Sequence, residues 1–321
     1  MATFVKDNIL PLPEELADNI TFERQKRSIR IAVLDTGFHA DERDELLKCG
    51  QERIILRRNF VGEDEHAYVD SYGHGTHVAR LLLRFTPFAK IIIAKISESK
   101  KLTGGSQVVK ALDWVGGPDC NADIIVMSFG LGQTPNPQLQ SLIKFLVEKG
   151  KLIFAAASNG GGNEPRAFPA NEAGVFCMHV SDGKGNKVGI NPAPVGIDNF
   201  STLGNAIDSR WDGEDIYING SSFAVPIAAA IAANALEFIR HALTDQEDRP
   251  GYFYHYQGMR ALFHCLSDGM DGYDYVKPWK RYLWDEETHP EDTCSALRAI
   301  VTYGHERWIK MTSEDSFRGF G

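Results

Sequence analysis

Short apolar runs alternate along the chain with segments whose apolar residues recur every three or four positions. The runs have the length of buried strands and cover residues 31–34, 91–95, 123–127, 151–157 and 175–180. The periodic segments cover residues 106–115 and 138–148 and predict amphipathic helices. Strands that alternate with helices indicate βαβ units, which predict an α/β fold with a mainly parallel sheet and helices on both faces.

A long alanine-rich segment, residues 223–240, is apolar on every side and predicts a helix buried in the core. Beyond about residue 245 the chain becomes aromatic and charged, with helices expected at 257–266 and 292–302. We therefore expect an N-terminal segment at 1–27, one α/β domain at 28–245, and an aromatic-rich, helical C-terminal part at 246–321 packed on that domain.

Composition excludes several classes of partner and location. The net charge is −9 without a basic tract, which argues against nucleic acid or an anionic membrane as a main partner. No apolar run reaches 18 residues, so no membrane span is expected. The N-terminal residues 1–8 contain no apolar h-region, so no signal peptide is expected. Five widely spaced cysteines without a CxxC pair indicate reduced thiols, and we expect a cytoplasmic protein.

Three residues with complementary chemistry lie at the ends of predicted elements. Asp35 follows the first apolar run, His74 lies between two glycines, and Ser222 begins the alanine-rich helix. A serine hydroxyl becomes a strong nucleophile when an imidazole removes its proton, and a carboxylate orients that imidazole. A helix N-terminus also favours developing negative charge beside the serine. The chain order Asp, His, Ser is one of three known for this constellation.

Four segments resemble the subtilisin-like serine peptidases, or subtilases. After the strand that ends in Asp-Thr-Gly, residues 73–79 (Gly-His-Gly-Thr-His-Val-Ala) match the family pattern in full. Residues 220–226 match except that Ser221 replaces threonine and Phe223 replaces methionine. Residues 152–160 are similar to the strand that delivers the oxyanion-hole asparagine. The resemblance extends over about residues 28–240.

The resemblance implies a serine endopeptidase that hydrolyses peptide bonds through an acyl-enzyme. Ser222 would be the nucleophile, His74 the general acid and base, Asp35 the orienting carboxylate and Asn159 the oxyanion donor. The substrate would be a peptide or protein, and the chemistry requires no cofactor.

The resemblance also implies that two edge segments clamp an extended peptide. The implied substrate-binding residues are Gly104, Gly105, Ser106, Ser128, Phe129, Gly130, Ala157 and Gly160. Residues 168–170 would close the pocket for the side chain before the scissile bond (P1). These segments carry no charge, so a large uncharged P1 residue is expected.

Two other functions use the same residues. A peptide amine that outcompetes water would make the enzyme an acyl transferase or macrocyclase, with the aromatic C-terminal part as a lid. Alternatively, a regulatory domain or inhibitor restrains the protease, because no folding propeptide is visible before Asp35.

Several residues admit a second interpretation. Ser221 is the rival nucleophile, although the family register favours Ser222. An aspartic peptidase would need a second Asp-Thr-Gly, and the nearest tripeptides, at 181–183 and 267–269, lie in predicted loops. His77 could bind zinc with His74, but no third ligand cluster accompanies them, so a packing role is expected. Arg80 stands where the family usually has a small residue and could reach an acidic group.

The metal content is left open. Acidic residues gather at Glu63, Asp64, Glu65 and Asp70, and structural calcium is common in the family. A solvated acidic face explains the same residues, and no Asp-x-Asp-x-Asp-Gly loop is present.

Overall fold

The computed structural model describes residues 27–100, 102, 105–243 and 250–278, together with separate residues between 292 and 299. The predicted helix at 292–302 therefore lies mostly outside the described residues.

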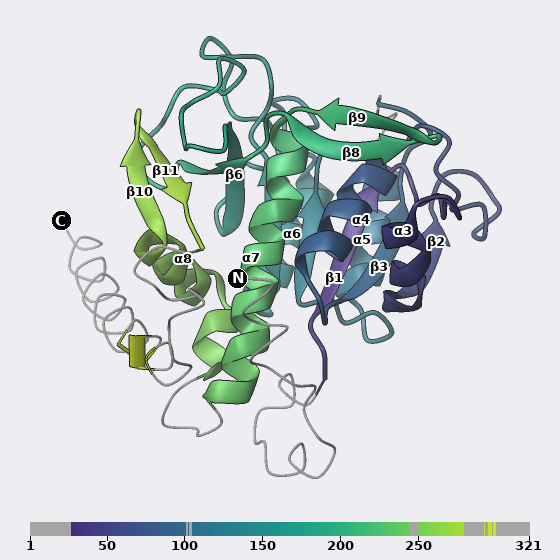
Figure 1. The fold of residues 1–321 in the computed structure, drawn as a ribbon, viewed down its shortest axis with the longest axis horizontal. Coiled ribbons are helices and arrows are strands. Elements are labelled where there is room, and N and C mark those ends of the chain that lie inside the picture. The colour runs from purple at the N-terminus through teal and green to yellow at the C-terminus, as the bar shows by residue number, and fades with distance from the viewer. Residues whose placement is uncertain are drawn as a thin grey trace.

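The described chain is built on one nine-stranded sheet (Figure 1). In chain order its strands are β1 Arg30–Asp35, β2 Ile54–Asn59, β3 Lys90–Lys95, β4 Ile124–Met127, β5 Leu152–Ala156, β6 Val175–Ser181, β7 Phe200–Leu203, β10 Ser267–Met270 and β11 Tyr273–Val276. Their spatial order is β10-β11-β7-β6-β5-β4-β1-β3-β2, and every neighbouring pair is parallel except β10 with β11.

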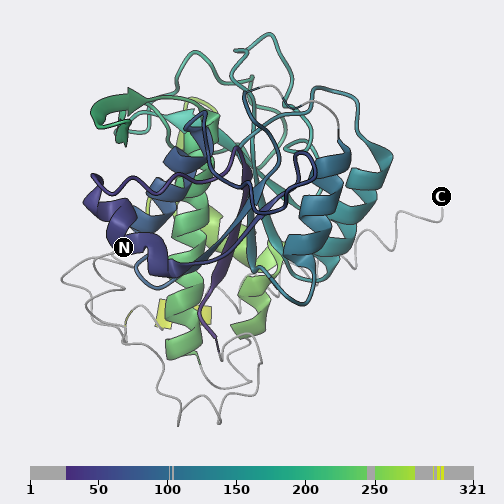
Figure 2. The same cartoon turned by 90° about the vertical axis from the view of Figure 1, so that its right-hand side faces the viewer.

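Helices cover both faces of this sheet, as the edge-on view in Figure 2 shows. One face packs against α3 Glu45–Gly50, α4 His74–Phe85 and α7 Ser221–Ala242, and the other against α5 Ser106–Gly116 and α6 Pro137–Glu148. Successive strand residues point to opposite faces. In β1, for example, Val33 joins the core under α4 and α7, whereas Leu34 joins the core under α5 and α6.

Smaller elements complete the fold. They are the 3₁₀ helices η2 Gln51–Arg53 and η4 Pro250–Tyr254, the antiparallel hairpin of β8 Ile207–Trp211 and β9 Glu214–Ile218, and the helix α8 Tyr256–Cys265. In Figure 1 the β8–β9 hairpin lies beside the N-terminal ends of α4 and α7.

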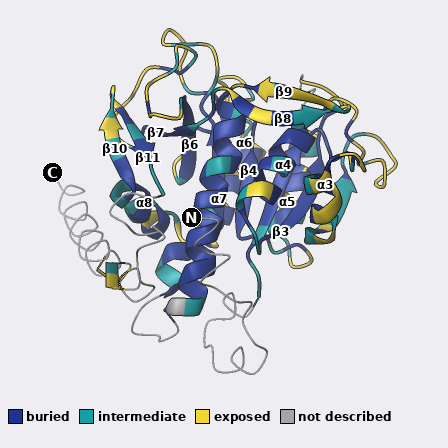
Figure 3. Cartoon of the chain, in the orientation of Figure 1, coloured by how far each residue is buried: buried dark blue, intermediate teal, exposed yellow. Residues whose placement is uncertain are grey.

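Helix α7 runs through the core, dark blue along most of its length in Figure 3. It is long and apolar enough to span a membrane by composition alone, but 89% of its most apolar window, within Ser221–His241, is buried inside the protein. The sequence prediction of a buried helix is therefore confirmed. Pro226 lies inside the helix, where it cannot donate to the Ser222 carbonyl four residues earlier, and that carbonyl accepts from the Ser128 hydroxyl instead.

The mainly parallel α/β fold is confirmed, but the C-terminal part is not helical throughout. Strands β10 and β11 extend the sheet from its β7 edge, and β11 pairs in parallel with β7. The tripeptide 267–269, expected in a loop, lies in β10. The boundaries between the three expected regions stay a prediction.

Candidate active site

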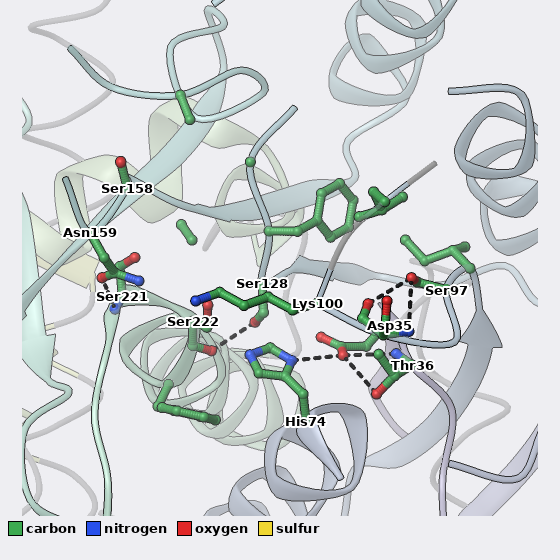
Figure 4. Close-up of a pocket in the computed structure, with 18 of the residues that line it drawn as sticks. Asp35, Thr36, His74, Ser97, Lys100, Ser128, Ser158, Asn159, Ser221 and Ser222 are labelled. Atoms are coloured by element: carbon green, nitrogen blue, oxygen red, sulfur yellow. Dashed lines mark hydrogen bonds and ion pairs between the residues drawn. The ribbon is translucent and has the colours of Figure 1, made fainter. Parts of the chain in front are cut away.

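The three residues with complementary chemistry (Asp35, His74 and Ser222) lie together at the carboxyl ends of the parallel strands, where α/β proteins commonly have their active sites. Strand β1 ends at Asp35, α4 begins at His74, and α7 begins one residue before Ser222. All three line one cavity of about 530 Å³, which Ser128 and Asn159 also line (Figure 4). Positions separated by up to 187 residues thus share one pocket.

His74 is oriented by a short hydrogen bond to a buried carboxylate. Its Nδ1 lies 2.7 Å from Oδ1 of Asp35, whose side chain is only 4% exposed. The Thr36 backbone N–H donates to the same oxygen at 2.8 Å. A carboxylate oxygen accepts hydrogen bonds, so the proton lies on Nδ1 and Nε2 is left as the base. Figure 4 shows the His74 ring between Asp35 and Ser222.

The pKa of His74 is raised above its ordinary value. Burial is the largest influence and lowers this pKa, but the Asp35 carboxylate, through its charge and its hydrogen bond, outweighs burial, and the charge of Asp70 adds to the increase.

The turn that presents His74 is held by Asp70, one of the acidic residues for which the sequence left a solvated face and a calcium site open. A solvated face is wrong for Asp70, which is 2% exposed. Its Oδ1 accepts from the N–H of Tyr72 at 3.0 Å and of Gly73 at 2.8 Å. Its Oδ2 accepts from the N–H and the hydroxyl of Thr76 at 2.9 and 2.8 Å. The carboxylate therefore fixes the backbone on both sides of His74.

Lys95 and Gly75 also hold this turn in place. Lys95 is buried in β3 and donates from Nζ to the carbonyl of Val69, the residue before Asp70, at 2.7 Å. Gly75 packs so closely that a Cβ on it would lie 2.5 Å from the Gly37 carbonyl oxygen. A larger residue there would push α4 away from the end of β1.

His77 packs against neighbouring side chains, as expected from the sequence. Burial, with a smaller effect from His74, lowers its pKa to about 4, so the ring is neutral near pH 7. Its Nδ1 lies 2.7 Å from the hydroxyl of Ser209 in β8. Its ring lies 5.8 Å from that of Trp211 and 6.3 Å from that of Phe223. The β8–β9 hairpin is thereby attached to the start of α4.

The two serines at the start of α7 differ in access. Both residues line the cavity, but Ser221 is 0% exposed, whereas Ser222 is partly exposed. The Ser128 hydroxyl donates to the Ser222 carbonyl at 2.8 Å, which ties this turn of the helix to the end of β4. Phe223, the departure from the family pattern, lies 5.2 Å from the His74 ring and packs against it.

Asn159 lies beside the same helix end. Its Oδ1 accepts from the Ser221 backbone N–H at 2.9 Å, which engages the carbonyl half of the amide and leaves Nδ2 as the donor. The preceding Ser158 has φ of 131°, a conformation that non-glycine residues rarely adopt and that often marks a functional site.

The structure brings some of the expected substrate-binding residues to the cavity and not others. Ser128, Phe129 and Gly130 line it. Gly105 and Ser106 do not line it: Gly105 is the N-cap of α5 and Ser106 its first residue. Residues 96, 97, 99, 100 and 102 line that side instead, and Gly104 lies outside the described residues. Ala157 is buried behind the wall, and Gly160 lies beneath the Glu164 side chain.

The segments expected to form the P1 pocket carry no charge, but the cavity as a whole has charged residues on its walls. Lys100 and Glu164 both line the cavity. Figure 4 shows the Lys100 side chain pointing along the pocket toward Ser222, and its charge lowers the pKa of His74. Sequence reasoning missed both residues because they lie in loops outside every motif.

The described residues contain no group of three or more His, Cys, Asp or Glu side chains that could hold a metal ion. Asp70, one member of the predicted acidic cluster, is engaged by backbone donors instead. Arg80 reaches an acidic group as the sequence suggested: its Nε lies 2.8 Å from Oδ2 of Asp44. Asp44 also caps α3 through its other oxygen, so the pair joins α4 to α3.

Comparisons with known proteins find relatives of one family. A family model described as the subtilase family matches residues 26–262. The chain is 29% identical to the subtilisin-like protease het-Q2 of Podospora anserina over 66% of this chain and 70% of that protein. It is 30% identical to an intracellular serine protease of Paenibacillus polymyxa over 64% of this chain and 66% of that protein.

A solved structure, that of the prenylagaramide maturation protease PagA, shares the fold. The TM-score is 0.53 at 22% identity, covering 67% of this chain and 81% of that one.

Proposed function

The chain belongs to the subtilase family, and from that premise we propose that it hydrolyses peptide bonds through Asp35, His74 and Ser222. The observation that carries this proposal is the 2.7 Å bond between Nδ1 of His74 and the buried Asp35, in the cavity that Ser222 lines. An imidazole that a carboxylate orients in this way is the general base that activates a serine nucleophile.

The reaction follows from the positions of these groups. Nε2 of His74 takes the proton from the Ser222 hydroxyl as Oγ attacks the carbonyl carbon of the scissile bond. The imidazolium that forms is stabilised by Asp35 and returns the proton to the leaving amine. Water then attacks the acyl-enzyme by the same path, and Oγ of Ser222 leaves.

The negative oxygen of the tetrahedral intermediate needs donors at the start of α7. We assign this role to Nδ2 of Asn159 and the backbone N–H of Ser222. Their support is the Asn159 bond to Ser221, which holds the amide beside the helix end, where the dipole also favours negative charge.

Labelling with a fluorophosphonate probe, followed by peptide mapping, tests the proposal. Ser222→Ala should abolish both labelling and peptide cleavage. The matched control is Ser221→Ala, which removes a hydroxyl that substrate cannot reach and should keep much of both. Labelling at Ser221, or full activity of Ser222→Ala, would refute the assignment.

Hydrolysis is favoured over transfer to an amine by the exposure of the pocket walls. Lys100, Asn159 and Glu164 are all exposed, so water has access to an acyl group on Ser222. Mass spectrometry of products formed with a peptide amine in excess separates the two reactions. A dominant amide product would show that the transferase alternative is correct.

We further propose a cytoplasmic location. Its support is the similarity to the Paenibacillus protein, whose name describes it as intracellular. Fractionation of cells that express the tagged full-length protein tests this, with secretion as the contrary result.

A further inference from the structure

One carboxylate lies on the wall of the substrate pocket without a role in the proposed chemistry. The Glu164 side chain covers Gly160 so closely that a Cβ on Gly160 would overlap its carboxylate. The carboxylate therefore occupies the space that a side chain at position 160 would otherwise fill, and glycine at 160 is what admits it.

The loop that carries Glu164 is fastened to both walls of the pocket. The Glu164 N–H donates to the Gly161 carbonyl at 3.1 Å, which closes a turn. Beyond this turn, Ala167 donates to Ala157 at 2.9 Å on one wall. Phe168 donates to Gly132 at 2.8 Å on the other wall. These backbone bonds fix where Glu164 enters the pocket.

The position of this wall identifies the substrate residue that meets it. The P1 side chain leaves the substrate backbone one bond from the scissile carbonyl carbon. The carbonyl oxygen is assigned to Asn159, so the P1 side chain enters the space beside residues 158–160 and 128–130. Glu164 stands on the first of these walls, next to Gly160.

The charge of Glu164 has no partner in the described part of the chain. No lysine, arginine or histidine nitrogen there lies within ion-pair distance of its carboxylate. Arg166, two residues later, is engaged elsewhere, with Nη2 donating to Oδ1 of Asn199 at 2.5 Å. An uncompensated charge in a binding pocket attracts a ligand group of opposite sign.

We propose that Glu164 makes the P1 pocket select lysine or arginine, an inference that rests on the proposed peptidase function. The aliphatic stem of such a side chain packs against Phe129, Ala156 and Ala167, which line the pocket. Its cationic head meets the Glu164 carboxylate. A bound substrate covers this pair and displaces water, which strengthens the attraction.

Lys100 restricts this preference to one position in the substrate. It lines the same cavity and points toward Ser222 (Figure 4). A substrate side chain that passes Lys100 meets a positive charge, whereas one that enters beside Gly160 meets a negative charge. The selectivity for a cation should therefore depend on its position in the peptide.

Cleavage of matched peptides tests the inference. Four peptides of one sequence carry Lys or Met at P1, or Lys or Met at P3, and kcat/KM is measured for each with the wild-type protein and with Glu164→Gln. We expect Glu164→Gln to lower the Lys/Met ratio at P1 by about tenfold or more, the size expected for a hydrogen-bonded ion pair. The ratio at P3 should change little. Glu164→Lys should reverse the P1 preference.

Glu172→Gln is the matched control. Glu172 is also a glutamate near the pocket loop, but its carboxylate accepts from Gln140 and does not line the cavity. This change should leave both ratios as in the wild type.

The outcomes separate the two proposals. If the peptides are cleaved and a fluorophosphonate probe labels Ser222, but the P1 ratio is the same in Glu164→Gln, the inference is wrong and the proposed function stands. Equal losses at P1 and P3 would also overturn the inference, because they indicate a general attraction of positive peptides. If the wild-type protein neither cleaves nor labels, the proposed function fails and this inference fails with it.

Discussion

Replacing Asp70 by asparagine tests how the His74 turn is held, because the two side chains have the same size. One carboxylate oxygen accepts from the Tyr72 and Gly73 amides, and the other accepts from the amide and hydroxyl of Thr76. Asparagine keeps one acceptor oxygen and places an NH₂ group against donors. The Thr76 hydroxyl can rotate and accept, but at least one backbone N–H loses its partner.

The expected loss of stability follows from the hydrogen bonds that asparagine cannot make. A buried donor left without a partner costs about 1–3 kcal/mol, and the remaining bonds lose the strength that the negative charge gives them. We expect Asp70→Asn to lower the free energy of unfolding by about 3 kcal/mol. For a chain of 321 residues, an unfolding entropy of about 2.1 cal/mol/K per residue gives about 1.5 °C per kcal/mol, so the melting temperature falls by about 4–5 °C.

The effect should depend on pH with a defined sign. Burial raises the pKa of Asp70 but is outweighed by the bonds from Gly73 and Thr76, so this pKa is lowered. A group with a lowered folded-state pKa stabilises the fold above its unfolded pKa of about 3.9, and the stabilisation is lost as pH falls through the folded value. The difference between Asp70→Asn and wild type should thus be full at pH 7 and shrink below about pH 4.

Urea unfolding at pH 7 and at several acidic pH values measures both quantities. Asp64→Asn is the control, since Asp64 belongs to the same predicted acidic cluster but is exposed and accepts from His66 at the surface. It should change the free energy of unfolding by less than about 0.5 kcal/mol. If Asp70→Asn unfolds like Asp64→Asn, the turn before His74 is held by other contacts and the argument is wrong.

Four further predictions concern the site and its support. Asn159→Ala should lower kcat by about 10²–10³-fold with little change in KM, the size known for the equivalent donor in subtilisin, and a change confined to KM would exclude an oxyanion role. The acid limb of the kcat/KM profile should lie above the ordinary histidine pKa of about 6.5, because the pKa of His74 is raised. Lys100→Met should move that limb to still higher pH, because Lys100 lowers this pKa, and a downward shift would contradict the geometry. Arg80→Met, which breaks the largely buried pair with Asp44, should cost about 1–3 kcal/mol in thermal or urea unfolding, and an unchanged stability would show that the pair is energetically neutral.

The sequence by itself determined the elements whose apolar residues recur at a regular spacing. The five predicted strands and the helices α5, α6 and α7 lie within a few residues of their predicted positions, because burial on a sheet face or along a helix imposes that spacing locally. These elements begin or end at or next to Asp35, Asn159 and Ser222. The sequence alone therefore predicted that these candidate residues lie at the ends of strands or helices. The strands β2, β7 and β8 to β11 were not predicted, since short strands that mix polar with apolar side chains leave little periodic signal.

Only the tertiary structure decided which partners these residues have. Asp70 belongs to an acidic stretch in the sequence, and its burial follows from the loop that folds it against Gly73 and Thr76. Ser221 and Ser222 are chemically alike, and they differ only in which way the helix end faces. Lys100 and Glu164 lie 64 positions apart, yet they line one cavity. The spacing of apolar residues along the chain indicates whether a side chain faces the core. The charges that line a pocket depend on which distant loops the packed sheet and helices bring together.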